Sequence, residues 1–252
     1  MSLLEYDDFH VLIVDNGSTN ESVEQIRLAM PTTEILETGV NRGFGGGCNV
    51  GIRKALSRGA DYIWLVNSDA TVDRGALSAL VRVANQSSKV GAVDSVLFEA
   101  NDKACVQLWG GGRVNLCLGR SVHCQVPGTV DFVSGASVLL RSSALKDVGL
   151  FDEVNFFMYW EDTDLGFRLR KAGWRLAVAD DSTVWHKQSA SLGAGSPLLD
   201  EYATRSCVRF LRRHAPFPAL SVSMMLFRML VKRLLLGRPD RIRAVLKAFR
   251  TA

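Results

Sequence analysis

The chain has 252 residues, enough for one large domain or two small ones, with 47% hydrophobic and 22% charged residues. This composition is typical of a packed globular protein and excludes a disordered chain, a collagen-like repeat and a multi-span membrane protein. The five cysteines are an odd number and form no C-x-x-C pair. They therefore argue against a disulfide framework or a zinc ribbon, and they fit a reducing cytoplasm.

The charges are distributed unevenly along the chain. From Arg205 onward there are 12 Lys or Arg and one acidic residue, whereas the first 204 residues contain 18 basic and 25 acidic ones. A basic tail predicts an anionic partner, and a membrane surface fits better than nucleic acid, because the tail lacks a recognition motif and interleaved stacking aromatics. No nucleic-acid partner is expected.

Neither end of the chain predicts a membrane-spanning segment. Met1 to Asp8 is short and acidic and lacks the apolar stretch of a signal peptide, so we expect a cytoplasmic protein. The longest uncharged stretch of the tail, Ala215 to Phe227, has 13 residues, fewer than the roughly 20 that a spanning helix needs. Attachment would then be peripheral, at the inner face of the cell membrane.

The first part of the chain alternates between strand and helix patterns. Apolar runs that end in turn residues predict strands, and longer amphipathic runs predict helices. The expected strands are His10–Val14, Glu34–Glu37 and Tyr62–Val66, and the expected helices are Glu21–Met30 and Cys48–Ser57. This rhythm predicts an α/β fold with a mostly parallel central sheet flanked by helices.

The pattern changes further along the chain. A helix at Ala76–Asn85 and a strand at Val90–Val96 precede a glycine-rich stretch, residues 98–130, which reads as irregular or hairpin structure. The remaining expectations are strands at Asp131–Arg141 and at Trp174–Ala179, the latter leading to His186, and a helix at Thr163–Ala172. Gly173 ends that helix.

Two aspartates follow the ends of predicted strands. Asp15 comes directly after the first strand and Asp69 shortly after the third. Because ligands of parallel sheets bind beyond the carboxyl ends of the strands, both carboxylates are expected at the same edge. The alternative is that each only caps a helix or shapes a turn.

The glycine-rich run from Asn41 to Asn49 looks like a phosphate loop but contains neither G-x-G-x-x-G nor the Lys of a Walker motif. Dinucleotide and ATP sites are therefore disfavoured. The glycines either help to shape a nucleotide pocket or let two segments of backbone approach closely.

An acidic cluster, Glu161-Asp162-x-Asp164, follows the aromatic run Phe156–Trp160. Apolar surroundings raise the pKa of a carboxylate and make it a better base; the alternative is an acidic first turn that complements the helix dipole. His186 ends another strand and, together with Asp69, offers the imidazole and carboxylate that suit a divalent cation. Most lone histidines are structural, and that alternative stays open.

Taken together, these segments resemble the family 2 inverting glycosyltransferases of the GT-A fold, in particular their bacterial rhamnosyltransferase-like branch. The resemblance extends from about Val11 to His186 and rests on the order of several short motifs. They are Val-Asp-Asn-Gly-Ser (14–18), Asn-x-Gly-Phe-Gly-Gly-Gly-x-Asn (41–49), Leu-Val-Asn-Ser-Asp (65–69), Gly-Leu-Phe-Asp-Glu (149–153) and Glu-Asp-x-Asp-Leu (161–165).

The resemblance implies a nucleoside diphosphate sugar as donor. Asp15 would contact its base and ribose, with Arg42 and Asn49 near the same pocket. Asn67-Ser68-Asp69 stands at the position of the family's Asp-x-Asp motif, with Asn67 in place of the first aspartate.

It also implies the catalytic groups. Asp69 and His186 would hold Mg²⁺ or Mn²⁺ on the diphosphate. Asp162 would be the general base that takes the proton of the acceptor hydroxyl, and Glu161 would position the acceptor, a cell-surface or lipid-linked glycan. A non-catalytic scaffold that binds a membrane or other partners is the alternative.

The implied organisation is a GT-A domain over residues 1–204, divided into a donor-binding half, 1–97, and an acceptor half, 98–204. We expect this fold to lack the family's first strand and helix, because only Met1 to Phe9 precede the first predicted strand. Cys48 stands where many relatives carry Arg or Asn. Residues 205–252 form a basic amphipathic helical tail, which either lies on an anionic membrane or packs on the body or on a second subunit; the sequence leaves the oligomeric state open.

Overall fold

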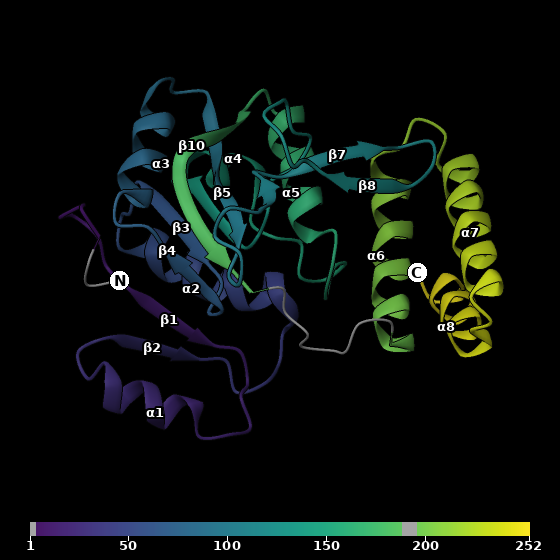
Figure 1. Ribbon diagram of the computed structural model, residues 1–252, viewed down its shortest axis with the longest axis horizontal. Coiled ribbons are helices and arrows are strands. Elements are labelled where there is room, and N and C mark those ends of the chain that lie inside the picture. The colour runs from purple at the N-terminus through teal and green to yellow at the C-terminus, as the bar shows by residue number, and fades with distance from the viewer. Residues whose placement is uncertain (1–3, 188–195) are drawn as a thin grey trace.

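A computed structural model describes residues 4–187 and 196–252. Figure 1 shows a central sheet with helices on both faces, a small two-stranded sheet beside it, and three helices standing together at the C-terminal end. The central sheet has the order β3-β9-β5-β10-β4, with β6 added to β5. Its strands are β3 (Tyr62–Val66), β4 (Ala70–Val72), β5 (Val90–Glu99), β6 (Val106–Trp109), β9 (Ser137–Arg141) and β10 (Arg175–His186).

The prediction of a mostly parallel sheet was wrong. Within the central sheet only β5 and β10 pair in parallel, while β9 pairs antiparallel with both β3 and β5, and β4 and β6 are also antiparallel to their neighbours. The strand and helix rhythm correctly indicates that β3 and β5 run in the same direction. It does not reveal that a later strand, β9, enters between them from the opposite end.

The first two strands form a sheet of their own. β1 (Leu12–Asp15) pairs in parallel with β2 (Glu34–Glu37), joined by α1 (Ser22–Ala29), and Asp15 lies opposite Glu37. Among the described residues, this pair has no ladder to β3. The half-buried side chains of β1 are held mainly through the helix that follows β2.

Helices cover both faces of the central sheet and enclose the core. On one face α2 (Gly43–Ser57), α4 (Ser142–Val148) and α5 (Glu161–Lys171) bury Ile52, Leu145 and Leu165. On the other face α3 (Ala76–Asn85) buries Leu77 and Leu80. α2 begins at Gly43, earlier than the predicted Cys48, so most of the glycine-rich run is helical.

The stretch between β6 and β9 contains the predicted hairpin. It is formed by β7 (Gly112–Asn115) and β8 (Arg120–His123) and extends toward the C-terminal helices (Figure 1). At its tip the carbonyl of Gly119 accepts a 3.1 Å hydrogen bond from the guanidinium of Arg228. The hairpin therefore connects the sheet to the tail.

The tail folds into three helices with their own core. α6 (Pro197–His214), α7 (Pro218–Leu235) and α8 (Pro239–Arg250) pack around Phe210, Met225 and Val245. Asp200 of α6, which is 3% exposed, forms ion pairs with Arg233 of α7 and Arg241 of α8. No helix among the described residues combines the length and apolarity needed to cross a bilayer.

Both expected divisions of the chain fall inside continuous elements of the structure. The division after residue 204 falls inside α6, and the division after residue 97 falls inside β5. A continuous helix or strand buries side chains along its whole length and does not end where the charge pattern changes. The helical tail accordingly begins at Pro197, where Ser196 caps α6 by accepting a hydrogen bond from the backbone N–H of Leu199.

Candidate active site

A carboxylate and an imidazole meet where β3 ends and β10 ends. β4 pairs antiparallel with the end of β10, which places His186 opposite Ala70. The Nε2 atom of His186 lies 3.3 Å from the Oδ1 atom of Asp69 and 3.4 Å from the Nδ2 atom of Asn67. The predicted pair of metal ligands is thus brought together, with Asn67 beside it.

The other ring nitrogen of His186 is held in place. Nδ1 lies 3.0 Å from the Oε1 atom of Gln107, and the amide of Gln107 donates in turn to Glu99. In the tautomer that donates its Nδ1–H to Gln107, the Nε2 lone pair faces the carboxylate of Asp69. Two electron-rich atoms so close together favour a cation between them, and a carboxylate with an imidazole suits Mn²⁺ or Mg²⁺. Within residues 4–187 and 196–252, no group of three or more His, Cys, Asp and Glu side chains forms a ready-made metal site.

Asp162 lies in the first turn of α5 and is connected to that corner. Its Oδ2 accepts a 3.3 Å hydrogen bond from the backbone N–H of Gly135, and its Oδ1 accepts a 2.6 Å bond from Thr163. The carbonyl of Ala136, the residue after Gly135, accepts a 3.0 Å hydrogen bond from the backbone N–H of Asn67. Two consecutive residues therefore bridge the predicted base and the Asn67–Asp69 turn.

Burial raises the pKa of the Asp162 carboxyl, although the three hydrogen bonds from Gly135 and Thr163 work against the shift. Asp94 lies nearby without any exposed surface and accepts two bonds from the N–H of Ser134, the residue before Gly135. Its pKa is raised well above the ordinary range by burial, and the charge of Asp162 adds to that effect. A carboxylate with a raised pKa at the edge of the fold is suited to accept a proton.

The neighbouring Glu161 is buried. It is 5% exposed, its Cβ lies against Gly45 of α2, and its Oε2 has no hydrogen-bond partner among the described residues. Burial is the main cause that raises its pKa to about 8, and the negative charge of Asp162 adds to the effect. The role of Glu161 in positioning the acceptor stays a prediction.

We expect Glu161→Gln to flatten the pH dependence of stability. Above pH 4.5 the unfolded chain releases the proton of Glu161 while the folded chain keeps it up to about pH 8, so the free energy of unfolding falls as pH rises through this window. The loss across this window is on the order of 5 kcal/mol, and the glutamine avoids it. Urea unfolding at several pH values measures both slopes, with exposed Glu24→Gln as control. Equal slopes for Glu161→Gln and wild type would contradict the assignment.

The turn before α5 has an unusual backbone. Tyr159 and Trp160 are both in the left-handed region, with φ of 66° and 71°, a conformation that costs non-glycine residues on the order of 1–3 kcal/mol each. α6 supports the turn: the hydroxyl of Ser206 donates to the carbonyl of Met158 at 2.9 Å, and Phe210 packs against Trp160 with ring centroids 4.7 Å apart. The tail thus holds the segment that carries the base.

Asp164, the last acidic residue of the cluster, has a structural role. It has no exposed surface and binds Arg168, Arg213 and His214, two of which belong to α6. Burial alone would raise its pKa, but the hydrogen bond from His214 and the charges of the two arginines outweigh it and lower the pKa. The acidic cluster therefore combines a candidate base with an anchor for the tail.

The donor-side residues lie around the turn after β1. The carboxylate of half-buried Asp15 accepts 3.2 Å hydrogen bonds from the backbone N–H groups of Gly17 and Ser18. The side chain of Asn16 bonds to the N–H of Arg42 and to the carbonyl of Gly43, at 3.0 and 2.9 Å. Asn16 thereby fixes the start of α2 against the Asp15 turn and leaves the side chain of Arg42 exposed beside it.

The glycines of α2 let its first turns pack closely. A Cβ on Gly43 would lie 2.0 Å from the carbonyl oxygen of Phe157, and one on Gly47 would lie 2.9 Å from the side chain of Asn16. The alternative of close backbone approach is therefore confirmed. These contacts place the Asp15 turn and the segment before α5 on opposite sides of one helix start.

Asn49, which was expected near the nucleotide pocket, is buried inside the fold. It has no exposed surface, and its side-chain amide makes hydrogen bonds of 2.9 and 3.1 Å with the carbonyl and N–H of Phe151. Both polar ends of the amide are thus used inside the fold. The pair fixes α2 to the segment that leads to α5.

Sequence reasoning missed three residues that shape the site: Asn16, Asp94 and Gln107. Asn16 stands directly after Asp15 and could have been found by the same strand-end argument. Gln107 lies in a segment with no distinctive pattern, and only its contact with His186 reveals it. Asp94, an acidic residue inside an apolar strand, was a visible signal because burial of a carboxylate is costly.

A family model described as "Glycosyltransferase like family 2" matches residues 1–197. The chain belongs to this family. It is a glycosyltransferase, as the resemblance predicted, and α6 to α8 lie almost wholly outside the matched range.

Two relatives illustrate the range of the family. The N-acetylglucosaminyl-diphospho-decaprenol L-rhamnosyltransferase of Mycobacterium tuberculosis is 29% identical over 222 residues, which cover 77% of this chain and 71% of the relative. The poly-beta-1,6-N-acetyl-D-glucosamine synthase of Staphylococcus aureus is 25% identical over 201 residues, which cover 75% of this chain and 45% of the relative.

Solved structures confirm the fold. The mannosyltransferase PcManGT from Pyrobaculum calidifontis, in complex with GDP-Man and Mn²⁺, superposes with a TM-score of 0.58 at 18% identity, covering 100% of this chain and 68% of the other. TarS of S. aureus, in complex with UDP-GlcNAc, superposes with a TM-score of 0.61 at 15% identity, covering 98% and 74%. The chain has the GT-A glycosyltransferase fold that the sequence predicted.

Proposed function

We propose that this chain transfers a sugar, with inversion, from a UDP- or dTDP-sugar to a hydroxyl of a lipid-linked or cell-surface glycan, and that dTDP-rhamnose is its first candidate donor. The observation that carries the proposal is the bridge through Gly135 and Ala136, which joins Asp162 to the turn that carries Asp69. The 29% identity to a rhamnosyltransferase whose named acceptor is a diphospho-decaprenol supports the donor and the lipid-linked acceptor.

The chain's own residues divide the work. Asp15 and Arg42 flank the start of α2, where they would bind the nucleoside and diphosphate. Asp69 and His186 would hold a divalent cation, which when bound offsets the negative charge that develops on the leaving diphosphate. Asp162 would take the proton of the acceptor hydroxyl on the opposite side of the sugar, so that attack and departure occur on different faces and the configuration inverts.

The raised pKa of Asp162 suits this role. Burial disfavours the charged form of a carboxylate. Asp162 therefore holds a proton more strongly than an exposed aspartate does. It is nevertheless only partly buried, and it accepts a hydrogen bond from the backbone N–H of Gly135. We place the reaction in the cytoplasm, where nucleotide sugars are the donors.

Calorimetric titration of the full chain with UDP and with dTDP, each with and without Mn²⁺, tests the donor assignment. We expect heat with at least one nucleotide, and tighter binding when Mn²⁺ is present. Asp15→Ala is expected to weaken that binding, while exposed Asp8→Ala serves as the matched control. No heat with any nucleotide would instead favour the non-catalytic scaffold.

A further inference from the structure

One face of α7 is apolar and uncovered. Buried Val222, Met225 and Met229 point into the core of the tail. The opposite face carries six apolar side chains that are 37% to 71% exposed: Phe217, Leu220, Met224, Phe227, Val231 and Leu234. They follow one another at intervals of three and four residues, so they form a continuous stripe along the helix. We call them the α7 stripe.

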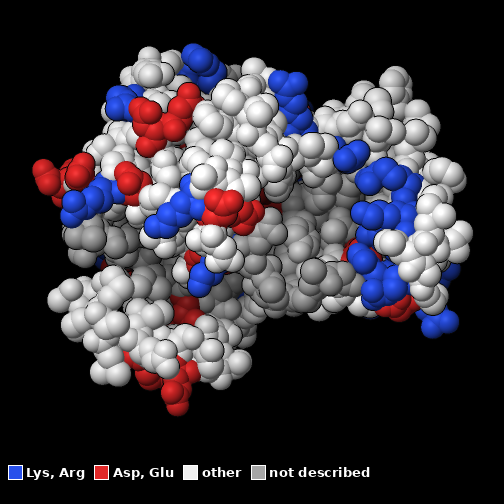
Figure 2. Space-filling model, in the orientation of Figure 1, with Lys and Arg blue, Asp and Glu red and all other residues white. Residues whose placement is uncertain are grey.

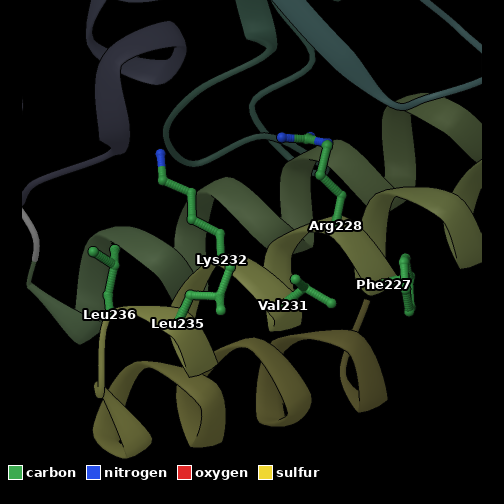
Figure 3. Close-up of a pocket in the computed structure, with 6 residues that line it drawn as sticks. All are labelled: Phe227, Arg228, Val231, Lys232, Leu235 and Leu236. Atoms are coloured by element: carbon green, nitrogen blue, oxygen red, sulfur yellow. The ribbon is translucent and has the colours of Figure 1, made fainter.

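The stripe is continued by two further leucines and bordered by positive charge. Leu235 and Leu236 are 81% and 57% exposed, and with Phe227 and Val231 they line a shallow groove whose other lining residues are Arg228 and Lys232. Figure 3 shows Arg228 and Lys232 pointing to the same side of α7. Figure 2 shows Lys and Arg side chains gathered over the lobe of the C-terminal helices.

Exposed apolar surface of this length marks an interaction site, and its charge selects the partner. No acidic residue occurs from Tyr202 to Pro239. Of the three basic residues of α7, Arg233 is paired with buried Asp200 and Arg228 donates to the carbonyl of Gly119, while Lys232 is exposed. An apolar stripe flanked only by basic side chains is complementary to a surface that combines hydrocarbon with negative charge.

We propose that α7 lies in the plane of an anionic membrane, with the α7 stripe among the acyl chains and exposed Lys232 at the phosphate groups. A second copy of the chain is the competing occupant, because the stripe also repeats every seven residues, as in a coiled coil. Two such faces would bring Arg228 and Lys232 of each copy together with no carboxylate to pair with them, which disfavours that contact. The bilayer supplies the negative charge that a second copy lacks.

The location of α7 gives the proposal a functional consequence, which rests on the proposed function. α7 packs on α6, and α6 holds the Met158–Trp160 turn directly before Asp162. A membrane-bound α7 would place the base-bearing turn near the bilayer surface. An acceptor sugar carried on a lipid diphosphate could then reach it without leaving the membrane.

Vesicle co-sedimentation of the full chain tests the proposal. We expect binding to vesicles of 70% phosphatidylcholine and 30% phosphatidylglycerol, and much weaker binding to pure phosphatidylcholine. Phe227→Glu with Leu234→Glu should reduce binding by at least about tenfold, because the buried apolar area is lost. Lys232→Ala should reduce it by about fivefold, on the anionic vesicles only.

Leu28→Glu, a change at an 84% exposed leucine of α1, is the matched control and should bind as wild type does. Thermal unfolding shows whether each variant is folded. The proposal is overturned if folded wild type binds neither vesicle, or if the double variant binds as well as wild type. It is also overturned if sedimentation without lipid shows a dimer that the double variant loses. None of these measurements needs a sugar donor. Their outcome therefore tests membrane binding separately from the proposed sugar transfer.

Discussion

Replacement of Asp162 by asparagine is expected to reduce sugar transfer by about 10²- to 10⁴-fold, the usual contribution of a positioned general base. Asparagine preserves the size of the side chain and can still accept the hydrogen bond from Gly135, so the fold and the binding of donor should remain intact. The loss should therefore appear in kcat. Transfer assays under single-turnover conditions measure the loss of the chemical step, and calorimetry measures donor affinity separately.

The pH dependence of wild-type transfer gives a second readout. The base must be ionised to act, and burial places the pKa of Asp162 above the ordinary 3.8 of an aspartate. kcat should thus rise with pH through an ionisation above that value, and Asp162→Asn should lose this limb. Asp181→Asn, which breaks an exposed ion pair with Arg82, is the matched control. Full turnover by Asp162→Asn would eliminate Asp162 as the base.

Removal of divalent cations by EDTA, or replacement of Asp69 by asparagine, is expected to slow transfer by at least about 10²-fold. Without the cation, the negative charge that develops on the leaving diphosphate loses several kcal/mol of stabilisation. The structural basis is the 3.3 Å approach of Asp69 to His186. Addition of Mn²⁺ should restore the EDTA-treated wild type but not the Asp69→Asn variant.

Binding of Mn²⁺ in the presence of UDP, followed by electron paramagnetic resonance, provides a readout that does not depend on turnover. Asp69→Asn should weaken it strongly. Asp61→Asn, which changes an exposed aspartate next to the opposite end of β3, should leave it unchanged. Equal Mn²⁺ affinity in wild type and Asp69→Asn would show that this carboxylate is not a ligand.

Local patterns predicted the elements around the donor side well. The bounds of β2, β3 and α3 agree with the predictions, because each is a short apolar or amphipathic run with clear turn residues at its ends. α4 was not predicted, and only the part of α6 after residue 204 lies within the predicted helical tail. The Ser196-Pro197 start of α6 was a visible signal, since a serine cap followed by proline is typical of a helix N-terminus.

The candidate site was predicted in part for the same reason. Asp69 and His186 both follow strand ends, and strand ends are recognisable in sequence, so their meeting was expected. Asn49 and Glu161 share motifs with functional residues, yet the structure buries both against neighbouring segments. A motif identifies which residues come together, but it does not show which of them keeps a free polar group.

The sequence alone determined the family, the GT-A fold, the strand ends that carry Asp15 and Asp69, and the charge of the tail, because these depend on residue types at short spacing. The tertiary structure decided the antiparallel insertion of β9, the bridge from Asn67 to Asp162, the support of the Tyr159–Trp160 turn by α6, and the face of α7 that remains exposed. Each of these depends on contacts between segments far apart in the chain. Such contacts are selected by the packing of the whole core, which no local pattern encodes.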